Sequence, residues 1–299
     1  MDKIIGIDVG GTFIKGGVIG EDGHTMYATK VKTPPTRTVE AVCEAIARLV
    51  ETLRREVQTD ARKIGVACPG AIDGERGIVL DSSNLKWANV PLKSILEEKT
   101  GAQVRICNDA DAALLAELEN GAAKGVRNVV MLTLGTGIGS GVFKDGKLLE
   151  RIELGHIVIK ENGRRCACGR RGCFEAYASA TGLLKGGLYA LKRNKTQTCL
   201  QADNFSCERL FSLCNTDDTA RKAVEEYIKN LVCGAANCVN IFQPDLLLLG
   251  GGVCAGLARF LPRLQTEINA QTAFPVELAI ARHKNGAGIL GAAALWSEV

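Results

Sequence analysis

Residues 129–143 read VVMLTLGTGIGSGVF, two apolar runs on either side of a glycine-rich turn at 135–139. Short apolar runs bounded by glycine are typical of buried strands joined by a tight turn. Residues 4–19 read IIGIDVGGTFIKGGVI and repeat this arrangement around a turn at 10–12. Two related strand–turn–strand units about half a chain apart predict a duplicated α/β domain with a cleft between the copies.

The rest of the chain alternates between strand and helix patterns. Apolar runs at 64–68, 104–107 and 246–249 predict further buried strands, each followed by polar or glycine residues. Helical spacing of apolar residues predicts helices at 39–53, 110–118, 224–239 and 286–295. Residues 185–218 are polar and weakly patterned, so no element is predicted there. The alternation is typical of the α/β class.

The composition is that of an ordinary globular protein, with 46% hydrophobic and 23% charged residues. A net charge of +4 is too small to indicate a nucleic-acid partner. No apolar run reaches the roughly 18–20 residues of a membrane span, and no signal peptide precedes the first strand. Twelve cysteines without a secretion signal favour a reducing compartment, so we expect a cytoplasmic protein.

Three cysteines form a cluster that differs from the other nine. Cys166, Cys168 and Cys173 follow the spacing C-x-C-x4-C, with two glycines inside the loop and His156 shortly before it. Three thiolates and one imidazole make the donor set of a closed, tetrahedral, structural zinc site. The alternative is three core cysteines and an unrelated histidine, since isolated buried cysteines behave as small hydrophobes.

Three glycine turns follow apolar strands, at 10–12, 135–139 and 250–252. The N–H groups of such turns can form a concave site for phosphate oxygens, although most glycine turns are only turns. The spacing at 135–139 does not match the dinucleotide motif G-x-G-x-x-G, and a Walker loop is absent. Together the turns indicate nucleotide binding in a different fold, with Asp8 placed to bind Mg²⁺ through water.

Asn108 and Asp109 follow the predicted strand at 104–107. Active-site groups of open α/β sheets gather at the carboxyl ends of strands, and phosphoryl transfer to a hydroxyl needs a proton acceptor. Asp109 is the candidate for that general base. The alternative is that the pair only caps the following helix.

In combination these motifs resemble the ROK family (repressors, uncharacterised frames and sugar kinases) of the actin-like ATPase superfamily, over almost the full length. Residues 8–12 resemble the first phosphate motif of the family, and residues 134–137 resemble the second. Residues 153–156 together with 166–175 resemble its most specific signature. Cys68 to Asp73, Asn84 to Trp87, Asn108 to Ala110, the turn at 250–252 and residues 287–293 resemble its remaining motifs.

The resemblance implies two ribonuclease-H-like domains, one of residues 1–120 with a C-terminal helix at about 287–299 packed on it, and one of residues 121–286 carrying the zinc loop. The reaction that it implies is phosphorylation of the 6-hydroxyl of a hexose by ATP, with glucose as the first choice of sugar. The implied cofactors are Mg²⁺ and a structural Zn²⁺, and Asp109 is the implied base. The implied sugar ligands are Asn84, Asn108, Asp109, Glu153, His156 and Glu175; the nucleotide-binding residues are Asp8, Gly10, Gly11, Thr12, Lys15, Gly135, Thr136, Gly137, Gly251 and Gly252; and the zinc ligands are His156, Cys166, Cys168 and Cys173.

Two other functions fit the same family. The substrate could be N-acetylmannosamine, N-acetylglucosamine, fructose or allose, because stereochemistry at one hydroxyl depends on placement that a sequence does not give. A sugar-sensing repressor would need a helix-turn-helix, and only three residues precede the first strand, which disfavours that function. The resemblance also implies a homodimer or homotetramer. The small net charge and the lack of a long apolar run predict no nucleic-acid or membrane partner.

Overall fold

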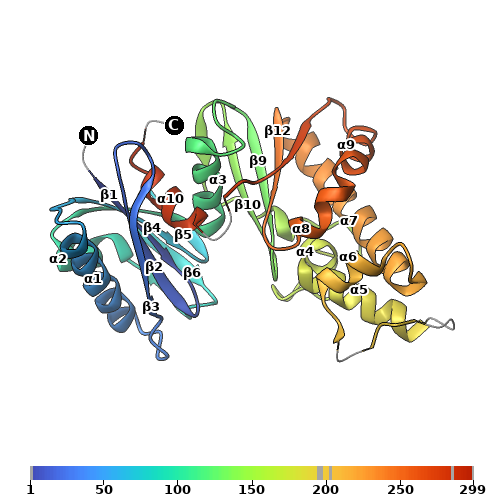
Figure 1. Cartoon of the computed structure of the whole chain (residues 1–299), viewed down its shortest axis with the longest axis horizontal. Helices are drawn as coiled ribbons and strands as arrows, with labels where there is room; N and C mark the ends of the chain where they lie inside the picture. The colour runs from blue at the N-terminus through green and yellow to red at the C-terminus, as the bar shows by residue number, and fades with distance from the viewer. Residues whose placement is uncertain (1–2, 194–197, 202–203, 284–285, 298–299) are drawn as a thin grey trace. The chain divides into compact units, whose positions relative to one another are not determined.

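The computed structural model describes residues 3–193, 198–201, 204–283 and 286–297, and it divides into two compact units (Figure 1). Unit 1 comprises residues 1–126, 141–151 and 282–299, and unit 2 comprises residues 127–140 and 152–281. The expected domains, 1–120 with the helix at 287–299 and 121–286, stay a prediction; parts of those ranges lie outside the described residues.

Most elements of unit 1 build one five-stranded and one three-stranded sheet with flanking helices, whereas its last strand belongs to the second five-stranded sheet. The elements of this unit are β1 (Ile4–Val9), β2 (Phe13–Ile19), β3 (Thr25–Lys32), α1 (Val39–Glu56), β4 (Lys63–Cys68), β5 (Ala71–Asp73), β6 (Ile78–Ser82), β7 (Trp87–Val90), α2 (Leu92–Thr100), β8 (Gln103–Asn108), α3 (Asp109–Asn120), β11 (Lys147–Leu149) and α10 (Ala287–Ala294).

The elements of unit 2 surround a second five-stranded sheet. They are β9 (Val129–Leu134), η1 (Leu154–His156), α4 (Glu175–Ala178), α5 (Ala180–Arg193), α6 (Cys207–Leu213), α7 (Asp218–Phe242), β12 (Leu246–Gly250), α8 (Cys254–Leu257), η3 (Ala258–Phe260), α9 (Leu261–Asn269) and β13 (Glu277–Ile280). Strand β10 (Ile138–Lys144) begins in unit 2 and ends in unit 1.

The two large sheets have the same strand order, which confirms the duplication expected from the glycine turns. The order is β3-β2-β1-β4-β8 in one sheet and β11-β10-β9-β12-β13 in the other. In the first, β4 lies parallel between β1 and β8, and in the second, β12 lies parallel between β9 and β13. The carboxyl ends of the parallel strands therefore meet at one edge within each sheet, where each glycine turn leaves.

The two faces of the first sheet carry different residues because side chains alternate along a strand. Ile5, Ile7 and Val9 point into the large apolar core formed with α1. On the other face lie Gly6 and Gly65, which are paired across β1 and β4. A Cβ at either glycine would overlap a backbone carbonyl of α10, so the glycines let this helix lie directly on the sheet.

We expect Gly65→Ala to lower the free energy of unfolding by about 1–3 kcal/mol, the usual cost of overpacking. The added methyl would meet the carbonyl of Ala292 in α10, which is backbone and cannot rotate away. Denaturant unfolding of Gly65→Ala beside Gly286→Ala measures this. Gly286 has no atom within 4 Å of an added Cβ, so equal stabilities of the two variants would contradict the packing argument.

Several elements were not expected from the sequence. Helix α6 and most of helix α5 lie in the region 185–218, where no element was predicted. The strands β5, β6 and β7 form a small antiparallel sheet that also went unpredicted. Within the described residues, no helix combines the length and apolar character needed to span a membrane.

Candidate active site

Unit 1 brings Asp8, Asn108 and Asp109 to one edge of its large sheet. Asp8 ends the pairing of β1 with β4, and Asn108 is paired with Cys68 at the end of β4 and β8. Because these strands are parallel, the three polar residues lie at their common carboxyl edge, as expected for an open α/β sheet.

Asn108 is the N-cap of α3, while Asp109 is the first residue of this helix. The Asn108 Oδ1 accepts a hydrogen bond from the Ala110 N–H at 2.7 Å, and Nδ2 donates to the Gly70 carbonyl at 2.6 Å. Asp109 is exposed, and its Oδ1 accepts from the same Ala110 N–H at 3.0 Å. The capping explanation thus holds for Asn108, and a carboxylate remains accessible at Asp109.

Two carbonyls of the turn between β1 and β2 accept hydrogen bonds from Thr33. Thr33 Oγ1 donates to the Gly10 carbonyl at 2.6 Å, and the Thr33 N–H donates to the Thr12 carbonyl at 3.0 Å. Among the described residues, no group accepts a hydrogen bond from the N–H of Gly11 or Thr12. Turn N–H groups without an acceptor in the protein can bind phosphate oxygens.

Asp8 is fixed by charge and by packing beside this turn. Lys15 Nζ lies 3.2 Å from Asp8 Oδ2, so the two residues form an ion pair. A Cβ at Gly288 in α10 would lie 2.6 Å from Asp8 Cγ, which shows that the start of this helix contacts the carboxylate closely. Asp8 and Lys15, two of the predicted nucleotide-binding residues of unit 1, therefore bind each other.

Asn84 lies in the loop between β6 and β7, in the same unit. Its side chain is exposed, whereas the neighbouring Leu85 and Trp87 are buried and anchor the loop. Its carbonyl accepts a hydrogen bond of 2.6 Å from Nη1 of Arg37, which also contacts the first glycine turn. The structure thus connects the Asn84 loop with the 10–12 turn.

In unit 2, the turns that follow β9 and β12 are neighbours. Gly251 has φ +91°, and a Cβ there would overlap the backbone of Leu134, the last residue before the 135–137 turn. Thr181 Oγ1 donates to the Thr136 carbonyl at 2.7 Å, and the Ala180 N–H donates to the Gly135 carbonyl at 2.8 Å. In both copies of the fold, a threonine hydroxyl therefore donates a hydrogen bond to a carbonyl of the glycine turn.

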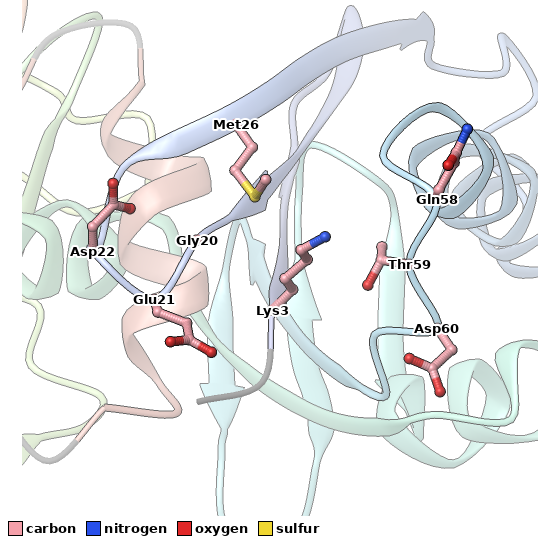
Figure 2. A pocket seen from close by; sticks show the side chains of 8 residues that line it. All are labelled: Lys3, Gly20, Glu21, Asp22, Met26, Gln58, Thr59 and Asp60. Atoms are coloured by element: carbon pink, nitrogen blue, oxygen red, sulfur yellow. The ribbon is translucent and has the colours of Figure 1, made fainter.

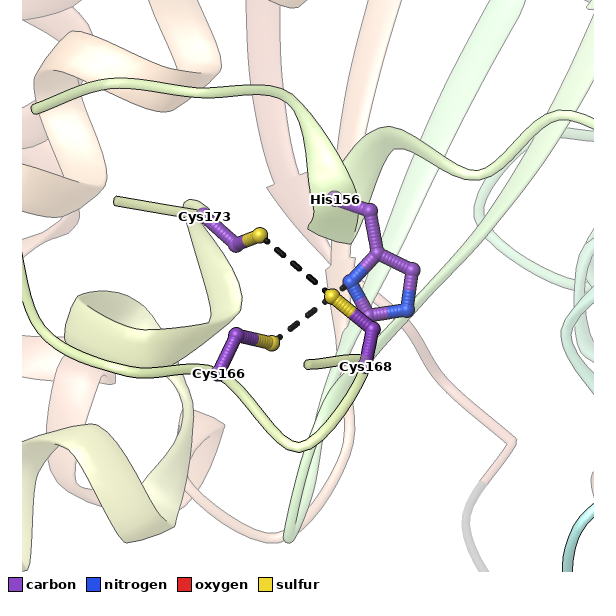
Figure 3. Close-up of side chains that lie close together, drawn as sticks. All are labelled: His156, Cys166, Cys168 and Cys173. Carbon is purple, nitrogen blue, oxygen red and sulfur yellow. Dashed lines mark hydrogen bonds between the residues drawn. The ribbon is translucent and has the colours of Figure 1, made fainter. Parts of the chain in front are cut away.

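The four predicted zinc ligands lie together (Figure 3). Cys168 Sγ and Cys173 Sγ are 3.6 Å apart, Cys166 Sγ and His156 Nδ1 are 3.8 Å apart, and all four ligand atoms lie within 4.8 Å of one another. In a tetrahedral zinc site, neighbouring thiolates are about 3.8 Å apart and a thiolate and an imidazole nitrogen about 3.6 Å. The donor set and its spacing fit Zn²⁺.

The chain around these ligands is built to turn sharply and to stay anchored. Gly169 and Gly172 have φ of +86° and +81°, a region that glycine enters without strain. Phe174 is fully buried, and its ring fills the space over Gly234 of α7, where a Cβ would overlap it. The loop is therefore attached to the longest helix of unit 2 directly beside its last cysteine.

Two thiols of the loop have opposite electrostatic surroundings. Burial raises the pKa of the Cys166 thiol to about 12. Desolvation also acts to raise the pKa of the Cys168 thiol, but hydrogen bonds from the backbone and side chain of Arg170 outweigh it and lower this pKa to about 6. The side chain of Arg170 therefore contacts the thiol of a predicted zinc ligand.

Glu175 connects the cysteine loop to the second glycine turn. Its Oε2 accepts a hydrogen bond from the Ile138 N–H at 3.0 Å, and its Oε1 lies 3.3 Å from Cys166 Sγ. Glu153 is exposed and its carbonyl accepts from the His156 N–H, which closes the η1 turn. Unit 2 thus brings together Glu175, His156, the cysteines and the 135–137 turn.

A pocket of about 790 Å³ lies elsewhere in unit 1 (Figure 2). It is lined by Lys3, Gly20, Glu21, Asp22, Met26, Gln58, Thr59 and Asp60. Lys3 precedes β1, whereas Asp8 lies near the end of this strand, so the pocket is at the opposite end of β1. No predicted site residue lines it.

The predicted site residues thus form one group in each unit. The sequence did not single out three residues that hold the turns, Thr33, Arg37 and Thr181. Thr33 directly precedes Pro34-Pro35 and Arg37 follows two residues after them, and no sequence pattern pointed to a functional role for these residues or for Thr181.

Comparison with known proteins places the chain in a family. The model of the ROK family matches residues 4–299. A glucokinase of Thermotoga maritima is 35% identical, covering 99% of this chain and 98% of its own, and an N-acetylmannosamine kinase of Citrobacter koseri is 32% identical, covering 97% of each.

Solved structures agree with this match and with the predicted fold class. A ROK hexokinase from Thermus thermophilus has a TM-score of 0.82 at 34% identity, covering 98% of this chain and 97% of its own. A ROK family glucokinase from Streptomyces griseus, solved in complex with glucose and AMPPNP, has a TM-score of 0.80 at 29% identity, with 98% of each chain covered. The α/β fold with two similar sheets is therefore the actin-like ATPase fold. With matching motifs, fold and full-length similarity, the chain belongs to the ROK family.

Proposed function

We propose that the protein is an ATP-dependent hexose kinase that phosphorylates the 6-hydroxyl of glucose. The observation that carries this proposal is the exposed carboxylate of Asp109 at the same sheet edge as the 10–12 turn, where the N–H groups of Gly11 and Thr12 have no acceptor among the described residues. Full-length similarity to proteins named glucokinase, and the glucose–AMPPNP complex of one of them, support the choice of sugar and nucleotide.

Asp109 acts as the general base in the proposed reaction. The 6-hydroxyl gives its proton to the carboxylate as its oxygen forms a bond to the γ-phosphorus of ATP, and the bond from that phosphorus to the β–γ bridging oxygen breaks. ADP carries away the electron pair of the broken bond. General-base assistance of this kind contributes about 10²–10⁴-fold to the rate.

The glycine turns supply the phosphate contacts in this proposal. Gly11 and Thr12 offer backbone N–H groups from unit 1, whereas the Gly10 N–H donates to the Phe13 carbonyl at 3.0 Å, and the turns at 135–137 and 251–252 offer backbone from unit 2. Asp8 Oδ2 is paired with Lys15, and Oδ1 remains as an oxygen ligand of the kind that hydrated Mg²⁺ prefers. Bound Mg²⁺ would neutralise phosphate charge, and Lys15 would keep Asp8 oriented.

The proposed sugar ligands are polar side chains of both groups: Asn84, Asn108, Asp109, Glu153, His156 and Glu175. Amides and carboxylates can bind pairs of hydroxyls, and a group left unpaired penalises the wrong stereoisomer. Zn²⁺ held by His156, Cys166, Cys168 and Cys173 would supply structural support, because a closed four-ligand site has no open position for chemistry. His156 Nδ1 faces the cysteines, so Nε2 is the nitrogen left for a sugar hydroxyl.

A kinase for N-acetylmannosamine is the second candidate. The Citrobacter koseri enzyme is nearly as similar to this chain as the Thermotoga maritima glucokinase, so overall similarity does not separate the two substrates. N-acetylglucosamine, fructose and allose are further alternatives. Assembly as a homodimer or homotetramer and a cytoplasmic location remain predictions.

A coupled assay of ADP release with ATP, Mg²⁺ and a panel of these sugars tests the proposal. We expect turnover with glucose well above a blank without sugar, and a lower kcat/KM with N-acetylmannosamine. The reverse ranking would make N-acetylmannosamine the preferred substrate in place of glucose. A folded, zinc-containing protein that turns over none of the sugars would refute the kinase function.

A further inference from the structure

We propose that Arg37 is a positioning residue that clamps the Asn84 loop to the first glycine turn, so that sugar and nucleotide bind cooperatively within unit 1. The role of the clamp in catalysis rests on the proposed kinase function, whereas the clamp itself is a property of the free protein. Four observations support it: the hydrogen bonds of the guanidinium, the backbone strain at Arg37, the hydrogen bonds that fix its backbone and the hydrogen bonds to the turn carbonyls.

The guanidinium of Arg37 joins two segments that are distant in sequence. Nη1 donates to the Asn84 carbonyl at 2.6 Å, 47 residues away, and Nη2 donates to the Gly11 carbonyl at 3.2 Å, 26 residues away. A planar guanidinium presents its donors in a fixed fork, so the two carbonyls are held at a set separation. A lysine ammonium has no such fork and would not fix both carbonyls in the same way.

The backbone of Arg37 is held in an uncommon conformation. Its φ is +51°, in the left-handed region that a residue with a side chain seldom occupies. Such strain persists where the surrounding structure enforces it, and it is frequent at functional sites. In this conformation the side chain of Arg37 reaches the Asn84 and Gly11 carbonyls.

Neighbouring groups enforce that conformation from three sides. The indole Nε1 of buried Trp87 donates to the Arg37 carbonyl at 2.8 Å, and the Arg37 N–H donates to the Pro34 carbonyl at 3.0 Å. The next residue, Thr38, caps α1 by accepting from the Ala41 N–H. Arg37 is thus fixed between a proline turn and a helix, and Trp87 ties it back to the strand that follows the Asn84 loop.

The bond to the Gly11 carbonyl completes the orientation of the turn. Thr33 donates to the carbonyls of Gly10 and Thr12, and Arg37 donates to that of Gly11. All three carbonyls of the turn therefore accept a hydrogen bond. The N–H groups of Gly11 and Thr12 are then fixed in advance, which is the arrangement that stabilises phosphate charge without reorganisation. A sugar that orders Asn84 would order Arg37 and through it the turn, which gives positive coupling.

A different role for Arg37 would be direct neutralisation of phosphate charge. Lysine would preserve such a role because it keeps the positive charge, but it would not preserve a clamp that needs two donors in one plane. Arg37→Lys and Arg37→Met therefore separate the two roles. Arg55→Met is the matched control, since Arg55 is an exposed arginine in the last turn of α1 whose ion pair is with the adjacent Glu56.

The first measurement uses the protein without ligands. The chain has two tryptophans, Trp87 and Trp296, so the indole N–H signal of Trp296 serves as an internal reference in a ¹⁵N–¹H spectrum. We expect both Arg37 variants to shift or broaden the Trp87 signal and to speed amide hydrogen exchange in residues 8–15 and 82–89. Unchanged signals and unchanged exchange would overturn the clamp, whether or not the protein is a kinase.

The second measurement tests the coupling by titrating AMPPNP with and without the sugar that the panel identifies. We expect the sugar to tighten AMPPNP binding at least about fivefold in the wild type and in Arg55→Met, and less than about twofold in both Arg37 variants. Wild-type coupling in Arg37→Lys would show that charge alone suffices, and absence of coupling in the wild type would refute the cooperative role. Melting temperatures and zinc contents equal to the wild type exclude a general loss of structure.

Discussion

Asp109→Asn is expected to reduce kcat with the preferred sugar by about 10²–10⁴-fold, with a much smaller change in the KM values. An amide cannot accept the proton of the 6-hydroxyl at neutral pH, whereas its size and its oxygen preserve the bond from the Ala110 N–H. The variant should therefore fold and bind both substrates. Initial rates from the coupled assay, together with melting temperatures, measure the effect.

Asp60→Asn is the control for that variant. Asp60 is exposed and lines the pocket at the opposite end of β1, so the same change of charge there should leave kcat within about twofold, as for most surface substitutions. If Asp109→Asn retained wild-type turnover, Asp109 would not be the base. The capping of α3 would then account for the Asn108-Asp109 pair.

Cys173→Ser is expected to abolish stoichiometric zinc binding and to lower kcat/KM by more than about 10–100-fold, the range found when groups supporting metal ligands are changed. A serine hydroxyl is a poor zinc ligand, and the remaining three groups cannot close a tetrahedron. Without the metal, His156 loses the anchor on its Nδ1 side, and Glu175 loses a fixed neighbour in Cys166. Elemental analysis of the purified protein and kinetics on the same sample measure both effects.

Cys233→Ser provides the matched control, because this cysteine is half-buried in α7 and lies outside the ligand cluster. It should retain the zinc content and the activity of the wild type. A wild-type protein that is folded and fully active without bound zinc would contradict the structural role of the site. Zinc loss without any loss of activity in Cys173→Ser would have the same meaning.

Most of the fold could be predicted because its decisive patterns are local. The strand–turn–strand runs at 4–19 and 129–143 combine apolar runs with glycine turns, and both were found where they were expected. Helix α5 was missed in part because its two adjacent glycines, Gly186 and Gly187, weaken the helical pattern. In the folded unit, Gly187 lies against Phe205 and Leu210, a contact that no local pattern can show.

The sequence alone determined the Cys/His cluster that is predicted to bind zinc, the three glycine turns and the position of Asp109 at a strand end, because spacing along the chain carries each of them. Only the tertiary structure decided that Arg37 joins Asn84 to Gly11. It also decided that Thr33 and Thr181 donate hydrogen bonds to carbonyls of the two turns, and that Glu175 accepts one from the Ile138 N–H. These contacts join residues up to 47 positions apart. Hydrogen bonds need atoms within about 3 Å, and packing of distant segments, rather than local preference, sets that separation.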